Sequence, residues 1–272
     1  MVDVDVVNTI DMLNGNGKIN YNLLFSSSNE LLKPIFSNFD FKGSDVLSVL
    51  GSGDQAFHFF KAKVGKLDLF DINKLTIYNM YLRYWNMLIH NQYYLPEDID
   101  NNYVLKLLSC VNPSSSDERV AFIYWSSLIK KCKNINDLFI PRSTIIDTKN
   151  EVNHKLKIVE GVRNHNFEFY NMDISKPSSL DKKYDYIYVS NIGDYVSKNP
   201  EAFRLYRDNL FRLLKDNGIV ICTNVIKDGA CYDEKRLFRE KFNCHNMPKV
   251  YRYSIFSPEV PGYYYEKINR RG

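Results

Sequence analysis

The stretch 45–71 constrains the fold more than any other part of the sequence. A short apolar run, 46–50, leads into the turn Gly51-Ser52-Gly53, and a segment with a helical pattern follows. A second apolar run, 67–70, ends at Asp71, twenty positions after the first glycine of the turn. Glycines allow a tight turn and the close approach of a ligand, and an acid at the end of the second strand can accept hydrogen bonds from ribose hydroxyls. The stretch therefore predicts a βαβ unit that binds a nucleoside.

The glycine turn lacks the third glycine of a dinucleotide fingerprint, because Ala56 and Phe57 stand where that glycine would be. S-adenosylmethionine suits such a turn better, since this cosubstrate has no pyrophosphate to place at a helix N-terminus. We predict that Gly51, Gly53 and Asp54 contact the cosubstrate and that the acid at position 71 binds its ribose. The alternatives are a purely structural turn and a solvent-exposed acid at a strand end.

The rest of the chain alternates between predicted strands and helices. Strands are expected at 46–50, 67–70, 167–171, 184–189 and 218–223, and helices at 28–36, 75–89, 203–214 and 234–242. Asn217-Gly218 is expected to end the third of these helices as a C-cap. Segments 249–257 and 263–268 are expected to pair as a closing antiparallel hairpin, which class I methyltransferase folds have after their fifth strand. The predicted fold is α/β, a doubly wound and mostly parallel sheet of the class I methyltransferase-like Rossmann type.

Two departures from a minimal fold are expected. Residues 1–40 are predicted to form an N-terminal arm and helix, with the arm over 1–20, and 41–272 to form the cosubstrate-binding α/β domain. Within that domain, the region from about 91 to 165 has helical patterns at 100–109 and 117–131 but no convincing strand. A crossover between parallel strands needs only about a dozen residues. We therefore predict a helical insertion after the second strand, over the ligand crevice at the carboxyl end of the sheet.

Polar residues also follow the third and fourth predicted strands. Asp173 either lies against the adenine amine or caps the segment that follows it. Ser190, Asn191 and Asp194 follow the fourth strand, from which residues of such folds reach the transferable group. We predict that Asn191 and Asp194 are catalytic, holding the amino acid moiety of the cosubstrate or orienting an acceptor. The alternative is a strand-end turn that uses these residue types for backbone reasons alone.

Composition disfavours several other classes of protein. The net charge of +4 is too small to indicate nucleic-acid binding, and no apolar run of about 18 residues predicts a membrane span. The acidic N-terminus argues against a secretory signal, and five cysteines without a C-x-x-C pair favour structural thiols, so a cytoplasmic protein is expected. The histidines show no ligand spacing, so no metal site is predicted.

The C-terminal segment from Tyr251 to Arg271 is rich in tyrosine and basic residues. An ordinary tyrosine-rich hairpin explains this composition. Contact of the segment with nucleic acid or with an anionic membrane surface is the alternative.

Several segments along the chain form a set of motifs. They are Ile19-Asn20-Tyr21-Asn22-Leu23-Leu24-Phe25, Leu31-Leu32, Val46 to Gln55, Phe70-Asp71-Ile72-Asn73, Ser190-Asn191-Ile192 and Asp194-Tyr195. Together these motifs resemble the S-adenosylmethionine:diacylglycerol 3-amino-3-carboxypropyltransferase family of betaine-lipid synthesis. The resemblance implies that the cosubstrate site also includes Tyr21, Ser52, Gln55, Ile72, Asn73, Ser190 and Asn191.

The resemblance further implies transfer of the 3-amino-3-carboxypropyl group to an acceptor, either a small molecule or a lipid headgroup. Asn191 and Asp194 would then hold the ammonium and the carboxylate of the moving chain. However, Phe25-Ser26-Ser27-Ser28 stands where the family has a Trp-Glu-Asp segment. A methyltransferase, and a non-catalytic nucleoside-binding or interaction module, are therefore the alternatives.

Overall fold

The chain forms two compact units, a helical unit and a sheet unit. The computed structural model describes residues 2–14, 24–25, 32–96, 98–140, 155–164, 167–176, 180–196, 198–225, 242–246 and 263–270. The helical unit comprises residues 1–29, 50–61 and 71–165, and the sheet unit comprises 30–49, 62–70 and 166–272. The division into an N-terminal part at 1–40 and a domain at 41–272 stays a prediction.

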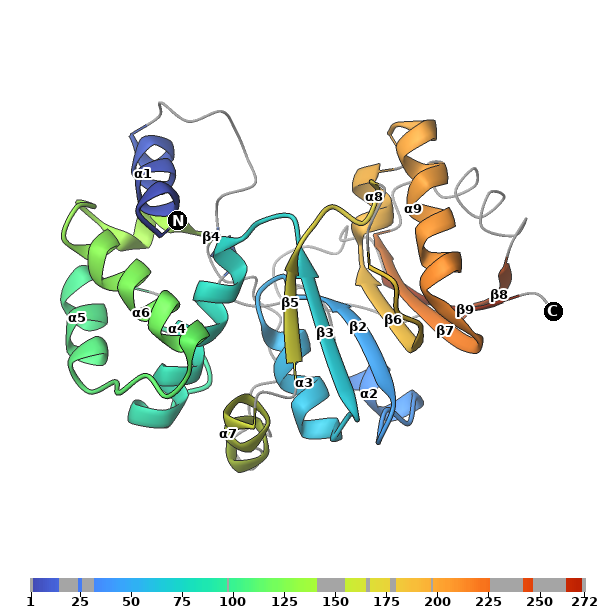
Figure 1. Cartoon of the computed structure of the whole chain (residues 1–272), viewed down its shortest axis with the longest axis horizontal. Helices are drawn as coiled ribbons and strands as arrows, with labels where there is room; N and C mark the ends of the chain where they lie inside the picture. Colours follow the sequence, from blue (N-terminus) through green and yellow to red (C-terminus); the bar gives the residue numbers. More distant parts are fainter. Residues whose placement is uncertain are drawn as a thin grey trace, which may run out of the picture. The chain divides into compact units, whose positions relative to one another are not determined.

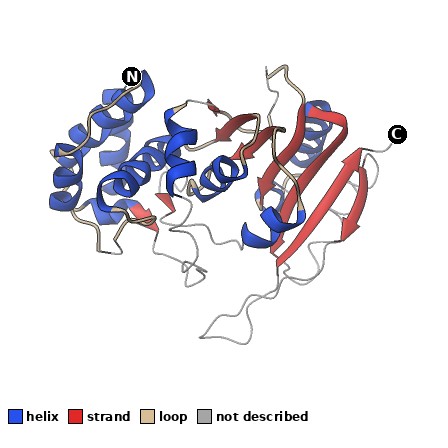
Figure 2. Cartoon of the chain, turned by 90° about the horizontal axis from the view of Figure 1, so that it is seen from below, coloured by secondary structure: helices blue, strands red, loops and turns tan. Residues whose placement is uncertain are grey.

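A seven-stranded sheet with the order β5-β3-β2-β6-β7-β9-β8 forms the core of the sheet unit (Figures 1 and 2). The strands are β2 (Asp45–Val49), β3 (Lys66–Asp71), β5 (Phe167–Asn171), β6 (Tyr184–Ser190), β7 (Leu214–Val225), β8 (Phe242–Asn246) and β9 (Tyr263–Arg270). Parallel pairing joins β2 to β3, β2 to β6 and β6 to β7, and β9 runs antiparallel to both β7 and β8. The strand order reverses at β2, which makes the sheet doubly wound. The predicted class I methyltransferase-like α/β fold is confirmed.

Burial explains why these runs are strands in the middle of the sheet. The apolar residues of β2 and β3 are buried almost throughout, as expected for central parallel strands covered on both faces. β5 at the sheet edge is only half-buried and carries polar residues. The helices of this unit are α2 (Leu32–Asn38), α8 (Ile192–Val196) and α9 (Pro200–Leu213).

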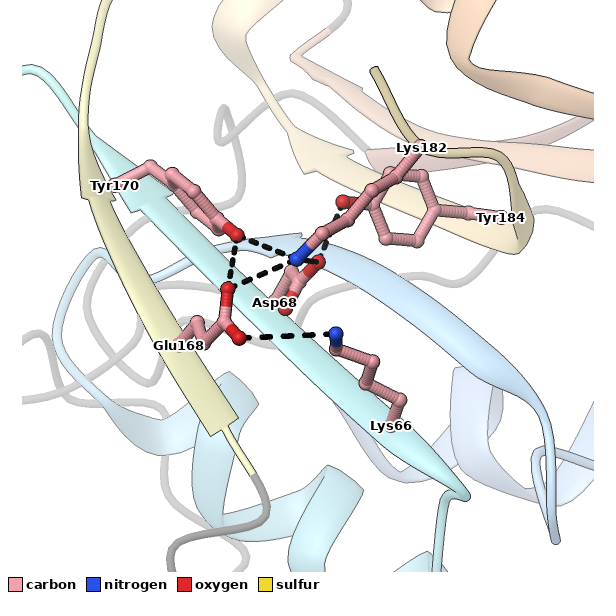
Figure 3. A network of polar contacts seen from close by, with 6 residues as sticks. All are labelled: Lys66, Asp68, Glu168, Tyr170, Lys182 and Tyr184. Atoms are coloured by element: carbon pink, nitrogen blue, oxygen red, sulfur yellow. Dashed lines mark hydrogen bonds and ion pairs between the residues drawn. The ribbon is translucent and has the colours of Figure 1, made fainter. Parts of the chain in front are cut away.

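A polar network joins the edge strand β5 to β3 and β6 (Figure 3). Asp68 of β3 is fully buried, and its Oδ2 accepts hydrogen bonds from Tyr184 Oη at 2.6 Å and from Lys182 Nζ at 3.1 Å. Lys182 Nζ also bonds Glu168 Oε2 at 2.8 Å and Tyr170 Oη at 2.6 Å, both on β5. The hydrogen bond from Lys182 lowers the pKa of Glu168 to about 2. Lys182 thus joins a buried acid to the edge strand.

Asn217 and Gly218 do not cap a helix, contrary to the prediction. α9 ends at Leu213 and β7 begins at the next residue. The register pairs Tyr184 with Leu214 and then Tyr186 with Ile219, so β7 has extra residues in a bulge that contains Gly218. A Cβ at Gly218 would lie 2.7 Å from Leu214 Cδ1 and 2.9 Å from the carbonyl oxygen of Tyr184. This glycine is needed for close approach and not for a left-handed cap.

The last strand pairs differently from the prediction. β9 lies between β7 and β8, with Ile268 opposite both Val220 and Cys244. Its expected partner, 249–257, lies outside the described residues, as does most of the helix expected at 234–242. Phe242 begins β8 and does not end that helix. The antiparallel closing pair exists, but its first strand is β8.

The helical unit consists mainly of helices. They are α1 (Val2–Leu13), α3 (Asp54–Ala62, which ends at the unit boundary), α4 (Leu75–His90), α5 (Asn101–Ser109), α6 (Ser116–Ile129), η1 (Ile135–Leu138) and α7 (Lys155–Arg163). The expected helices at 100–109 and 117–131 are confirmed as α5 and α6. Two short strands, β1 (Leu24–Phe25) and β4 (Phe139–Ile140), pair in parallel, and β4 was not expected within the insertion.

Residues 2–13 form a helix instead of the expected arm. Val6 and Thr9 are buried, and the Thr9 hydroxyl lies 3.1 Å from the hydroxyl of Tyr124 on α6. Asp5 Oδ2 accepts hydrogen bonds from Lys74 Nζ and Tyr78 Oη, each at 2.8 Å. Packing and polar bonds to α4 and α6, which the sequence pattern did not reveal, therefore stabilise this helix.

Candidate functional site

The glycine turn has the backbone conformation that its sequence predicts. Gly51 and Gly53 follow β2 with φ of 53° and 91°, a region that residues with a Cβ rarely adopt. The N–H of Gly53 donates to the carbonyl of Leu50 at 2.8 Å, which closes the turn. A Cβ at Gly53 would lie 3.6 Å from Met80 of α4, so the turn packs closely on that helix.

Asp71, the last residue of β3, is bonded to this turn. Its Oδ2 accepts the N–H of Gly51 at 2.9 Å, and its Oδ1 accepts the N–H of Asn73 at 2.9 Å. The predicted ribose acid and the predicted turn, twenty residues apart, are therefore in direct contact.

Burial controls the ionisation of Asp71. The residue is only 8% exposed, and burial raises the pKa of its carboxyl from 3.8 to about 6, although backbone N–H groups of Asn73 and Gly51 act to lower it. The donors already present do not offset the loss of water. Further hydrogen-bond donors, such as hydroxyl groups, would stabilise the ionised form.

Asp54 at the start of α3 is engaged inside the protein. Its Oδ1 forms an ion pair with Arg83 Nη2 at 2.6 Å, and its Oδ2 accepts the Ser52 hydroxyl at 2.8 Å. Arg83 is fully buried in α4. Burial disfavours the charged guanidinium, but the Asp54 carboxylate outweighs this effect and keeps the pKa of Arg83 above its usual value. The carboxylate thus holds the turn together.

Sequence analysis missed Arg83. One signal was available, because Arg83 is the single charged residue in the stretch from Tyr78 to Met87, where every other residue except two asparagines is apolar or aromatic. A charge in the buried part of such a helix requires a partner. Nothing local in the sequence identifies Asp54 as that partner.

The remaining predicted residues near the turn differ in exposure. Gln55 is buried, and its side-chain amide lies 3.6 Å from the position of a Cβ on Gly51. Asn73 is buried, and its Oδ1 accepts the N–H of Leu75 at 3.0 Å, at the start of α4. Ile72, which lies between Asp71 and Asn73 in the sequence, is 49% exposed. An exposed apolar side chain beside a buried acid is suited to contact with a flat apolar ligand group.

The sheet unit carries the other predicted residues. Ser190 ends β6 with φ of 53°, an uncommon value for a residue with a Cβ, and its hydroxyl lies 3.3 Å from Asn191 Oδ1. Asp173 Oδ1 accepts both the N–H of Ser175, at 2.9 Å, and its hydroxyl, at 2.6 Å. Oδ1 of Asp173 therefore caps the segment that follows it, and a contact of Asp173 with the adenine amine stays a prediction. Asp194 lies in α8.

The predicted site residues are divided between the two units. Residues 51–55 and 71–73 gather in the helical unit, and Asp173, Ser190, Asn191 and Asp194 belong to the sheet unit. Tyr21 lies outside the described residues. The ligand roles of all these residues stay predictions.

In the described part of the chain, no group of three or more His, Cys, Asp or Glu side chains is arranged to hold a metal ion. No helix among the described residues is long and apolar enough to cross a bilayer.

Comparisons with known proteins find similar structures but no similar sequences. No protein-family model matches the chain, and no curated protein sequence matches it. The N-methyltransferase NodS from Bradyrhizobium japonicum is 9% identical, with a TM-score of 0.46 over 88% of this chain and 94% of that chain. A SAM-dependent O-methyltransferase from Thermotoga maritima is 11% identical, with a TM-score of 0.48 over 97% and 72%. The glycopeptide N-methyltransferase MtfA, complexed with S-adenosylhomocysteine, is 9% identical, with a TM-score of 0.47 over 92% and 94%. The fold assignment rests on the strand order and not on these similarities.

Proposed function

We propose that the protein is an S-adenosylmethionine-dependent transferase whose cosubstrate binds at the glycine turn and Asp71. The observation that carries the proposal is the hydrogen bond from the Gly51 N–H to the Asp71 carboxylate. It brings a buried acid to a turn with two glycines of positive φ, on a fold whose strand order reverses at β2.

The chemistry of the turn supports a nucleoside without phosphates. The ribose hydroxyls would share the Asp71 oxygens with the backbone donors and would stabilise the ionised carboxylate. The third glycine of a dinucleotide fingerprint is absent at Ala56 and Phe57, and the first residue of α3 is Asp54. S-adenosylmethionine has no pyrophosphate to place at this helix N-terminus.

Catalysis would consist mainly of alignment. The sulfonium already activates the carbons attached to it, so the protein has to hold an acceptor in line and exclude water. We propose that the 3-amino-3-carboxypropyl group is transferred, because the Gly51–Gln55 and Ser190–Ile192 segments resemble that family. Asn191 and Asp194 would hold the moving chain. Transfer of the methyl group is the second candidate, because the strand order is that of class I methyltransferase folds.

Calorimetry with S-adenosylmethionine tests the cosubstrate. Wild-type protein should bind it, Asp71→Ala should lose binding, and Asp98→Ala, which removes an exposed acid of the helical unit, should bind normally. Absence of binding by the wild type, or undiminished binding by Asp71→Ala, contradicts the proposal.

The nucleoside product identifies the transferred group. After incubation with cell extract as the source of acceptor, methylthioadenosine indicates aminocarboxypropyl transfer, and S-adenosylhomocysteine indicates methyl transfer. If the protein binds the cosubstrate but releases neither product, the non-catalytic module remains as its function.

A further inference from the structure

Arg83 bonds the glycine turn at two points from a fully buried position in α4. Its Nη2 pairs with Asp54 Oδ1 at 2.6 Å, and its Nη1 donates to the backbone carbonyl of Ser52. The side chain is 0% exposed. One planar guanidinium therefore reaches both the middle of the turn and the first residue of α3.

Ser52 is held through its carbonyl and its hydroxyl. Its carbonyl accepts from Arg83, and its hydroxyl donates to Asp54, which Arg83 also holds. The residues on either side are glycines, which lack the steric restriction that limits the backbone elsewhere. The bonds to Ser52 thus restrain the part of the turn that is otherwise most free.

The environment of Arg83 suits a guanidinium specifically. Its Cζ lies 5.3 Å from the ring centre of Phe57, 5.4 Å from that of Tyr93 and 5.3 Å from that of Tyr94. Flat rings accommodate a planar cation, and the two amino groups of a guanidinium can bond two acceptors in fixed directions. A lysine ammonium at this position would not reproduce this geometry.

Stability alone does not explain such a pair. Two buried charges lose their hydration, and well-packed apolar residues of similar volume often stabilise a fold as well or better. Arg83 also donates a directional hydrogen bond to the Ser52 carbonyl, which an apolar side chain could not do.

We propose that Arg83 is a positioning residue that holds the turn in its ligand-binding shape before the cosubstrate arrives. This inference rests on the proposed function, because the turn is where the cosubstrate is proposed to bind. A turn that is already ordered loses less conformational entropy on binding and so binds more tightly.

The experiment uses the full chain with three variants, Arg83→Lys, Arg83→Met and the double variant Arg83→Met/Asp54→Asn. Two controls accompany them. Arg119→Met removes an exposed arginine from α6, and Lys182→Met breaks an ion pair to the buried Asp68 in the sheet unit. Three quantities are measured: the melting temperature, amide hydrogen exchange of residues 51–55 without ligand, and the Kd for S-adenosylhomocysteine.

Arg83→Met should speed exchange in the turn and weaken binding by about tenfold or more, with Arg83→Lys between it and the wild type. Neither control should change turn exchange or Kd by more than about twofold. The double variant leaves no unpaired charge in the interior, so its melting temperature should recover while its turn exchange stays fast and its binding stays weak. It also provides the test if Arg83→Met does not fold.

Recovery of both stability and binding in the double variant would show a merely structural pair and overturn the inference. So would a folded Arg83→Met protein with wild-type turn exchange. If the wild type fails to bind S-adenosylhomocysteine, the proposed function is wrong, and hydrogen exchange alone decides whether Arg83 orders the turn.

Discussion

The carboxylate of Asp71 accepts a hydrogen bond from the N–H of Gly51 at 2.9 Å, so the end of one parallel strand is tied to the turn that follows its neighbour. This bond couples the Gly51 end of the turn to the charge of the buried Asp71 carboxyl. Because burial raises the pKa of Asp71 to about 6, that charge changes close to neutral pH.

Cosubstrate affinity should therefore fall in mild acid. Asp71 is ionised at pH 7 and protonated well below pH 6, and a neutral carboxyl accepts hydrogen bonds from ribose hydroxyls poorly. Affinity should decrease by at most about tenfold per pH unit below the pKa. Ligand binding would favour the ionised form, so calorimetry at pH 6 in two buffers of different ionisation enthalpy should show proton release. A Kd constant from pH 5 to pH 8 contradicts this prediction.

The raised pKa of Asp71 predicts that the free energy of unfolding changes with pH in the opposite direction to the affinity. The folded protein holds this proton up to about pH 6, whereas the unfolded chain releases it near pH 3.8. The contribution of Asp71 to the free energy of unfolding is therefore fully present below about pH 4 and is lost as the pH rises through 6. A comparison of the wild type with Asp71→Ala isolates it.

Gly53→Ala should damage ligand binding, and Gly43→Ala should not. Both glycines have positive φ, 91° and 72°, so each alanine should reduce the free energy of unfolding by about 1–2 kcal/mol. Gly43 has open space around it and lies in the turn before β2, whereas the proposed ligand-binding turn follows β2. Denaturant unfolding measures the loss of stability that the two variants share. Calorimetry measures the difference between their Kd values for the cosubstrate. Equal Kd values for the two variants would argue against the turn as a ligand site.

Lys182→Met should destabilise the protein, while the neighbouring exposed Lys183→Met should have little effect. Removal of Lys182 takes one of two hydrogen-bond donors, Lys182 and Tyr184, from Oδ2 of the fully buried Asp68, and it releases Glu168 and Tyr170 of the edge strand. Because Lys182 is itself 32% exposed, we expect a loss of about 2 kcal/mol, below the roughly 3–5 kcal/mol for a fully buried pair. Urea unfolding of both variants measures this. A similar loss for both would show that the network adds nothing specific.

Gly218→Ala should destabilise β7 through a collision. Its methyl group would lie 2.9 Å from the Tyr184 carbonyl oxygen, which is backbone and cannot move aside. We expect a loss of about 1–3 kcal/mol, against a small change for the adjacent and exposed Asn217→Ala. If the glycine were a helix cap instead, substitution by asparagine would be tolerated, so Gly218→Asn distinguishes the two explanations.

The sequence predicted the parts of the fold that depend on local order. β2, the turn and β3 follow from apolar runs, two glycines and one acid within 27 residues, and their contact needs no distant partner. The parallel order was predictable because alternating strands and helices allow few topologies.

Errors arose where distant partners decide the structure. Gly218 has the same sequence context as a helix cap, and only the approach of Tyr184 reveals its role. Helix α1 is held by hydrogen bonds that Lys74 and Tyr78 donate to Asp5, which no periodicity reveals. Arg83 was missed for the same reason, because its partner Asp54 is 29 residues away in the sequence.

The position of β9 between β7 and β8 has a consequence for synthesis on the ribosome. β8 is synthesised before β9 but pairs with β9. β7 also needs β9 to cover its open edge. During translation the nascent sheet therefore exposes the unpaired backbone groups of β7 until residue 270 has left the exit tunnel. The period in which the chain is most prone to aggregate is set by the last strand to emerge, and completion of the sheet occurs after the glycine turn and Asp71 have already been synthesised.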